Sequence, residues 1–176
     1  MKISHREFGA ERKTIADHEL LSDRARLQKI PFALTGAQAG PFPVSTEAMW
    51  CVEELGNYRV KNVPFFIDGL SFDDLIAISR EGAEGAWRIQ GVVEPSGNST
   101  IWIYAGDSTE GEKLVDRLIA MGCGAEAGVI PDLYAINVPA SHSISDVYAV
   151  IDVGVEERLI EVDYPSIRHV DGRRLE

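Results

Sequence analysis

Residues with catalytic or metal-binding chemistry are few in this chain and widely spaced. The four histidines are His5, His18, His142 and His169. None of them follows the HExxH spacing of a zinc enzyme, and no cysteine pair joins them at zinc-site intervals. We therefore expect no metal and no cofactor. We expect surface histidines, and Cys51 and Cys123 as free, buried thiols in a reducing compartment.

Nucleophilic and phosphate-binding motifs are equally weak. Ser96, Ser99 and Thr100 occupy a turn rich in small residues, but no G-x-S-x-G elbow surrounds them. The glycines form neither a GxxxxGK[ST] loop nor a strand-linked GxGxxG. An enzyme would need a site assembled from groups that no local motif reveals, for example around Asp68, Asp73, Ser99 and His142. The chain is therefore expected not to be an enzyme.

Carboxylates are abundant, and they are unevenly distributed. The net charge is -11 over 176 residues: residues 1–46 carry seven Lys and Arg against five Asp and Glu, whereas residues 47–176 carry ten against 23. Such a body repels phosphate backbones and anionic lipids, so we expect neither a nucleic-acid nor a membrane partner. A basic protein partner is favoured electrostatically. The simpler alternative is that the acidity only aids solubility.

The composition is that of a globular chain, with 45% hydrophobic residues. No apolar run approaches the roughly 20 residues needed to cross a bilayer. The first residues, MKISHREFGAERK, lack the apolar core of a signal peptide. The pattern predicts a cytoplasmic protein.

The elements that would position any site fall into an N-terminal extension and two units. Residues 1–46 are expected to form the extension, because Asp17–Ile30 has helical apolar spacing and a Pro- and Gly-rich linker follows. Residues 47–98 change to strand periodicity, with strands expected at 48–55, 58–67, 75–79 and 86–93. Short antiparallel strands of this kind are most simply buried in a small β-barrel-like unit.

Residues 99–168 are expected to form the second unit, and residues 169–176 a tail. A strand at 99–105 and a helix ending before Gly122 are followed by strands at 127–130 and 133–138, a helix opened by Ser143 or Ser145, and a strand at 159–162. The order β-α-β-β-α-β predicts a ferredoxin-like α+β arrangement, with one sheet face left open for a cover or a partner.

Two segments carry a resemblance to a known family. They are Asn62-Val63-Pro64-Phe65-Phe66 and residues 93–100, VEPSGNST. With the surrounding strands they resemble the uncharacterised bacterial family named domain of unknown function 4265, over roughly residues 47–165. Where the family's SGHST-like turn is expected to have His, this chain has Asn98, which argues against a catalytic histidine there. The resemblance implies a continuous fold and a bacterial origin, and it carries no established activity.

Three functional classes follow from these patterns. The leading hypothesis is a non-catalytic immunity or inhibitor protein that neutralises a basic toxin or nuclease domain by occluding its active surface. The expected contact residues are Glu53, Glu54, Asp68, Asp73, Asp74 and Glu94. The alternatives are a small-molecule-sensing regulatory domain and an enzyme. Aromatic residues in the strands are expected to fill the core, and any that are exposed would mark an interface.

Overall fold

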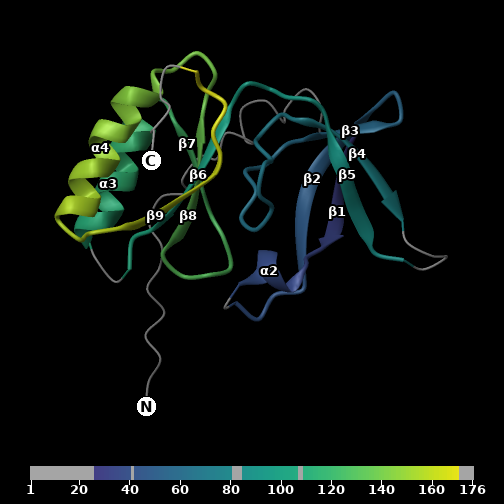
Figure 1. Ribbon diagram of the computed structural model, residues 1–176, viewed down its shortest axis with the longest axis horizontal. Helices are drawn as coiled ribbons and strands as arrows, with labels where there is room; N and C mark the ends of the chain where they lie inside the picture. The colour runs from purple at the N-terminus through teal and green to yellow at the C-terminus, as the bar shows by residue number, and fades with distance from the viewer. Residues whose placement is uncertain (1–25, 41, 81–84, 107–108, 171–176) are drawn as a thin grey trace.

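The computed structural model of the chain describes residues 26–40, 42–80, 85–106 and 109–170. These residues form two units that lie beside each other, a closed barrel and a four-stranded sheet with two long helices (Figure 1). The helices cover the face of the sheet that points away from the barrel (Figure 1). The predicted α+β class, with antiparallel sheets, is therefore confirmed.

The barrel contains the first five strands in the order of the sequence. They are β1 (Leu27–Ala33), β2 (Thr46–Glu54), β3 (Asn57–Val60), β4 (Leu75–Arg80) and β5 (Trp87–Glu94). Successive strands pair antiparallel, and a parallel contact between Phe32 and Trp87 joins β1 to β5 and closes the barrel. Its interior is filled by Ile30, Phe32, Met49, Cys51, Val60, Ile67, Leu70 and Ile76. Because β1 and β5 pair only at Phe32 and Trp87, the closure is narrow.

The N-terminal helix prediction is wrong for the residues that the structure describes. Leu27–Ile30 lie in β1, which pairs with β2 along its whole length, whereas residues 17–25 lie outside the described residues. Ile30 and Phe32 alternate into the barrel, and this period of two outweighs the apparent helical spacing. Pro31 is tolerated because β1 meets its second neighbour only at Phe32. The barrel thus begins within the predicted extension, before residue 47.

A second difference concerns the segment from Lys61 to Asp74, which we call the seam loop. The sequence predicts a strand from Tyr58 to Ile67, but β3 ends at Val60. The backbone N–H groups of Val63, Phe65 and Phe66 donate to carboxylates of Glu126 and Glu47. Because side chains accept these hydrogen bonds, this part of the segment needs no ladder partner and departs from the strand pairing, while Ile67 and Leu70 further along it pack inside the barrel.

The second unit follows in the order strand, helix, strand, strand, helix, strand. Its elements are β6 (Ser99–Tyr104), α3 (Thr109–Ala120), β7 (Gly124–Ala127), β8 (Leu133–Val138), α4 (Ile144–Glu156) and β9 (Glu161–Ser166). The strands pair antiparallel in the order β7-β8-β6-β9. The strand predicted at 127–130 lies earlier, at 124–127, whereas the strand predicted at 133–138 has those bounds.

Local signals explain where the helices begin and end. Ser143 caps α4 by accepting a hydrogen bond from the Asp146 N–H, and α4 buries Val147, Val150 and Ile151. The apolar face of α3 packs into the same core. After α3 ends, Gly122 adopts a φ of 97°, a conformation that favours glycine and turns the chain toward β7. No helix in the described part of the chain has both the length and the apolar character needed to span a bilayer.

The seam loop covers the sheet face that the helices leave open. Val63 and Phe72 pack against Ala135 of β8, with Phe65 and Trp102 at the edge of this cluster. The Trp102 indole N–H donates to the Pro64 carbonyl at 2.7 Å, which fixes the ring against the loop. The barrel itself therefore supplies the cover that the open sheet face requires.

Candidate functional site

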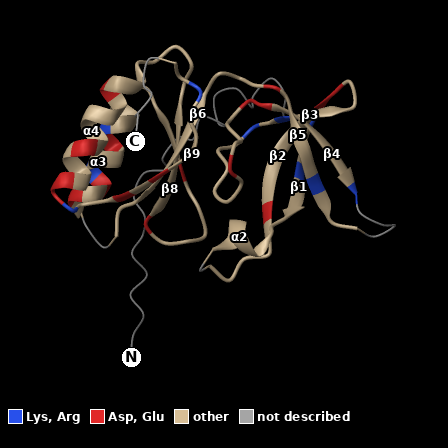
Figure 2. Ribbon diagram, viewed as in Figure 1, with Lys and Arg blue, Asp and Glu red and all other residues tan. Residues whose placement is uncertain are grey.

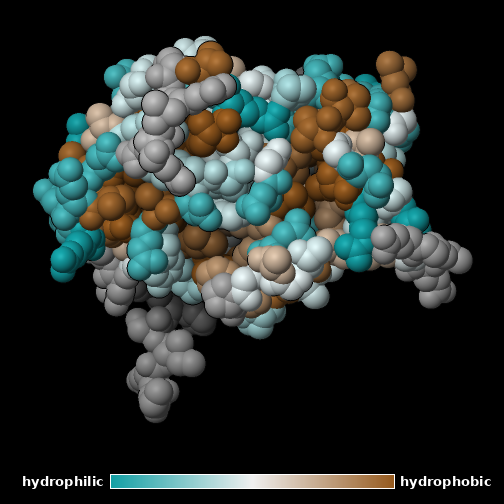
Figure 3. Space-filling model, viewed as in Figure 1, coloured by the Kyte–Doolittle hydropathy of each residue, from teal (hydrophilic) through white to brown (hydrophobic). Residues whose placement is uncertain are grey.

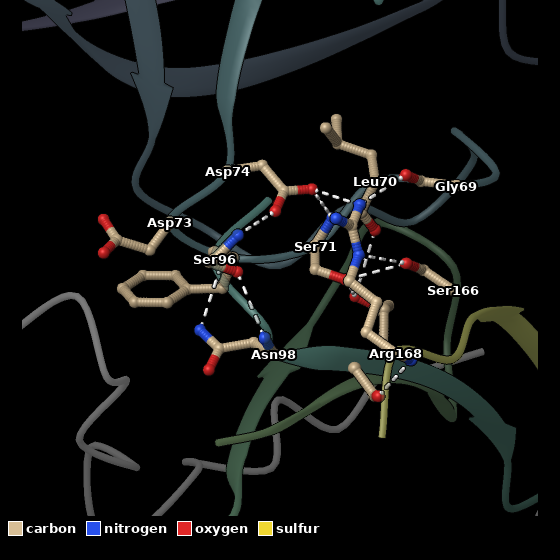
Figure 4. Close-up of polar contacts among 12 residues, drawn as sticks. Gly69, Leu70, Ser71, Asp73, Asp74, Ser96, Asn98, Ser166 and Arg168 are labelled. Atoms are coloured by element: carbon tan, nitrogen blue, oxygen red, sulfur yellow. Dashed lines mark hydrogen bonds and ion pairs between the residues drawn. The ribbon is translucent and has the colours of Figure 1, made fainter. Parts of the chain in front are cut away.

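A buried polar network joins the two units where the seam loop meets the end of β9 (Figure 4). Asp74 is fully buried, and its carboxylate accepts hydrogen bonds from the N–H groups of Ser71 at 2.9 Å and Ser96 at 2.8 Å. Arg168 Nη2 lies 2.7 Å from the same carboxylate. The expectation that Asp74 contacts a partner is therefore wrong, because its oxygens are occupied within the fold.

The network continues through hydroxyl and backbone groups of both units. The Ser71 hydroxyl donates to the Ser166 hydroxyl at 2.9 Å, and the Thr100 hydroxyl donates to the Leu70 carbonyl at 3.1 Å. The Gly69 N–H donates to the Pro165 carbonyl at 2.8 Å. Since these groups satisfy one another in the interior, the network fixes the two units together rather than presenting reactive groups.

Two other predicted partner-binding carboxylates are held in ion pairs on the barrel. Glu54 pairs with Arg59 at 2.9 Å, and Asp73 pairs with Lys61 at 2.7 Å. The hydrogen bonds from Arg59 hold the pKa of Glu54 below its ordinary value. The exposed Glu94 lies 3.6 Å from the same guanidinium. Much of this charge is therefore balanced locally.

The last two predicted carboxylates, Glu53 and Asp68, are exposed. Asp68 lines a cavity at the junction of the units, whereas Glu53 projects from β2 of the barrel. The structure thus brings Glu54 and Glu94 together around one arginine, but it does not gather the six predicted residues into one surface.

Ser99 and His169 form a buried pair that the sequence does not predict. Their Oγ and Nδ1 atoms are 2.7 Å apart, and His169 Nε2 lies 3.0 Å from the Pro139 carbonyl. Because a carbonyl can only accept, the imidazole proton is on Nε2, and the Ser99 hydroxyl donates to Nδ1. Ser99 is fully buried, so the pair anchors the end of the chain and is closed to a substrate. The prediction of a surface histidine is wrong for His169.

A cavity of about 350 Å³ opens between the two units; we call it the aromatic cavity. Five aromatic side chains line it: Phe42, Phe65, Phe66, Trp102 and Tyr104. Three carboxylates line it as well, from Asp68, Glu161 and Asp163. Hydrophobic residues reach the surface at this junction (Figure 3). Its volume is within the range of about 300–1,000 Å³ that is usual for small-molecule sites.

A second cavity, of about 510 Å³, lies between β2 and the turn after β7. Glu47 lines it, is buried, and accepts the N–H groups of Phe65 at 2.6 Å and Phe66 at 3.1 Å. Burial raises the pKa of Glu47 to about 7, although these two hydrogen bonds oppose the shift. Glu47 is therefore a buried carboxyl group that holds the seam loop against β2.

The outer surface of α4 carries a distinct acidic face. Its carboxylates are Asp146, Asp152, Glu156 and Glu157, and residues 144–157 contain no Lys or Arg. The exposed Val153 lies among them, and the exposed Val155 lies at the edge of this surface, where it lines a cavity with Arg158. Acidic segments colour both helices in Figure 2. We call the four carboxylates and two valines the α4 acidic face.

Other reactive groups in the described residues give little support for chemistry. Those residues contain no group of three or more His, Cys, Asp or Glu suited to hold a metal ion. Cys51 and Cys123 are free and buried, and burial raises their thiol pKa values to about 12 and 11. Of the strand aromatics expected in the core, Trp50 and Tyr104 are instead exposed.

Sequence reasoning missed Glu47, Arg168 and the carboxylates of β9. The spacing of Glu161 and Asp163, two apart in a strand, places them on one sheet face and could have marked the aromatic cavity. Nothing local marks Glu47, whose partners Phe65 and Phe66 lie 18 and 19 residues further along the chain. Its role depends on the fold alone.

Comparison with known proteins places the chain in a family. A crystal structure of a hypothetical protein from Neisseria gonorrhoeae is similar, with a TM-score of 0.64 and 17% identity, covering 81% of this chain and 94% of that chain. At this identity the similarity concerns the fold alone. No curated protein sequence matches the chain. The domain of unknown function DUF4265 matches residues 47–162, from the start of β2 into β9. The chain is therefore a member of the DUF4265 family.

Proposed function

We propose that this protein is a non-catalytic binding protein that docks a basic protein partner through the α4 acidic face. The observation that carries the proposal is the placement of Glu156 and Glu157 at the C-terminal end of α4, with no basic residue in its last turn. Carboxylates there oppose the negative end of the helix dipole, at a cost of about 0.3–1 kcal/mol each. We take this loss of stability as a sign that the two carboxylates are kept for binding a partner.

The shape of this face also suits a partner. Val153 is 45% exposed and lies between the helix positions of Asp146 and Glu156, so a partner can bury apolar area while its cations meet the carboxylates. This surface differs from the barrel carboxylates that the sequence suggests. There Asp74 is buried, and Glu54 and Asp73 are already ion-paired.

The biological setting that fits this chemistry is an immunity or inhibitor protein. In the bacterial cytoplasm, it would occlude the active surface of a basic toxin, such as a nuclease domain, without catalysis of its own. In support, the buried polar groups of the seam are engaged with one another. The inhibitor would hold its partner on the helices of a ferredoxin-like second unit, whose β-α-β-β-α-β order presents both helices outward.

A growth-rescue assay tests the proposal with the basic proteins encoded by neighbouring genes, each first expressed alone to find one that stops growth. Co-expression of this chain is expected to restore growth, and Asp146→Asn/Glu156→Gln/Glu157→Gln is expected to abolish rescue while remaining folded. The control, Glu53→Gln/Glu94→Gln, removes two exposed barrel carboxylates and should rescue fully; Glu156→Gln/Glu157→Gln, which removes the same number of charges from α4, should not. Failure of the wild type to rescue, or loss of rescue only in the barrel variant, would contradict the assignment.

A second function, small-molecule sensing, is favoured by one specific observation. The aromatic cavity lies where the barrel meets the sheet, so a bound ligand would contact Phe42 and Phe66 on one side and Trp102 and Tyr104 on the other. Ligand contacts with both units would favour one relative placement of the two. Ligand-dependent dimerisation or a ligand-dependent change in shape, measured by small-angle scattering, would support this function over inhibition.

A further inference from the structure

We propose that the aromatic cavity binds a small organic cation, that is, an alkylammonium or quaternary ammonium group. The proposal is independent of partner docking by α4, because the two surfaces share no residue. It follows from the chemistry of the lining, the strand register that arranges it, and the hydrogen bonds that hold it in place.

The lining combines π faces with negative charge. Five of the fourteen residues around the cavity are aromatic and three are carboxylic, and none of the fourteen is Lys, Arg or His. Aromatic faces attract cations through the ring quadrupole, and carboxylates add a direct charge attraction. Two neighbouring cavities differ in charge: Lys29 lines the second cavity, and Arg158 lines an adjoining one of about 480 Å³ that shares Tyr104 and Glu161 with the aromatic cavity.

The register of β6 and β9 places each of the two β9 carboxylates beside an aromatic ring. Tyr104 pairs with Glu161, and Trp102 pairs with Asp163. Residues two apart on a strand share one face, so both pairs face the barrel side of the sheet. A cation in the cavity can therefore approach a ring and a carboxylate together.

Hydrogen bonds fix the walls before any ligand binds. The Trp102 indole donates to Pro64, and the N–H groups of Phe65 and Phe66 donate to Glu47. Phe42 meets Phe66 edge to face, with ring centroids 6.1 Å apart. A rigid wall loses little conformational entropy on binding, and this favours a small ligand. The cavity volume of about 350 Å³ also suits a small amine better than a folded partner.

The test compares n-butylammonium with n-butanol, which has the same shape without the charge. Binding is followed by NMR of the indole N–H signals, since the chain has three tryptophans and Trp102 lines this cavity. We expect n-butylammonium to shift the Trp102 signal saturably and n-butanol not to do so. Equal binding of the alcohol, no saturable shift, or a response confined to Trp50 of the second cavity would overturn the proposal.

Variants separate this site from general attraction to an acidic protein. Glu161→Gln/Asp163→Asn should weaken n-butylammonium binding about tenfold. Glu156→Gln/Glu157→Gln, which removes the same charge from α4, should leave it unchanged. Tyr104→Leu should weaken binding, whereas Tyr104→Phe should retain it, and Tyr104 is 42% exposed, so both should fold. An equal loss in the α4 variant would refute the site.

Two kinds of ligand carry an alkylammonium group, a free amine and the side chain of a lysine in a protein. Nα-acetyl-lysine N-methylamide presents an alkylammonium group on a peptide backbone and is titrated in parallel with n-butylammonium. Tight binding of the free amine alone identifies a small-molecule site, whereas equal binding of both identifies a site for a lysine side chain. Binding of neither would overturn the proposal.

Discussion

Replacement of Glu47 by glutamine is expected to change how the stability of the protein depends on pH. Glu47 is 7% exposed, and burial raises its pKa from 4.5 to about 7 in the folded protein. The folded state thus binds the proton more tightly than the unfolded state does. The resulting stabilisation is fully present below pH 4.5 and is lost as the pH rises through 7.

The magnitude follows from the size of the shift. Each pKa unit corresponds to about 1.4 kcal/mol, so the full change in the free energy of unfolding is about 3 kcal/mol. By the same linkage relation, the wild type loses about 2 kcal/mol of its free energy of unfolding as the pH rises from 5.5 to 8.5. Glutamine resembles the protonated carboxyl group, with one acceptor and one donor end, and stays neutral. The variant does not lose this stability, so the free energy of unfolding of Glu47→Gln is expected to rise by about 2 kcal/mol relative to that of the wild type as the pH rises from 5.5 to 8.5.

Urea unfolding at several pH values between 5.5 and 8.5 measures this difference and avoids the isoelectric region near pH 4.8. Groups other than Glu47 contribute equally to both proteins, so they cancel in the comparison. The control, Glu156→Gln, removes an exposed carboxylate and should follow the wild-type pH dependence. Parallel curves for Glu47→Gln and wild type would refute the claim that burial controls this carboxyl group.

Three further predictions concern the core and the seam. Arg168→Ala leaves the buried Asp74 carboxylate without its cation and should lower the free energy of unfolding in urea by about 3–5 kcal/mol, whereas Lys113→Ala, at an exposed pair, should change it by less than about 0.5 kcal/mol. Gly111→Ala should lower the melting temperature despite better helix propensity, because its Cβ would lie 2.8 Å from the Leu159 carbonyl oxygen; Gly36→Ala, with open space around it, should not. Cys51 and Cys123 should resist a thiol reagent in the native protein and react fully in denaturant, and rapid native labelling would show that the thiols are accessible.

Periodicity predicts the second unit well because its signals are local. The short, almost continuous apolar run Leu133–Val138 and the Ser143 cap each lie within a few residues, so β8 and the start of α4 are found where the sequence places them. β1 is different, because Leu27 and Ile30 also fit a helix. Only pairing with β2, about 20 residues later in the chain, decides between the two structures.

The candidate sites were harder to predict than the elements. Nothing in the residues around Asp74 distinguishes it from a carboxylate on the surface. Its role as a buried structural charge depends on Arg168, which is 94 residues away in the sequence. Asp68 is the one residue of the predicted set that also lines the aromatic cavity. The rest of that lining comes from segments distant in sequence, and only the meeting of barrel and sheet gathers them.

The most direct test of partner docking is the association rate of the basic partner as a function of ionic strength. For the wild type we expect the rate constant to fall steeply as salt rises, because attraction between the α4 acidic face and a cationic surface is screened. For Asp146→Asn/Glu156→Gln/Glu157→Gln we expect a slower rate at low salt and a much weaker dependence. A wild-type rate that is independent of salt, or the same salt dependence in both proteins, would contradict the account.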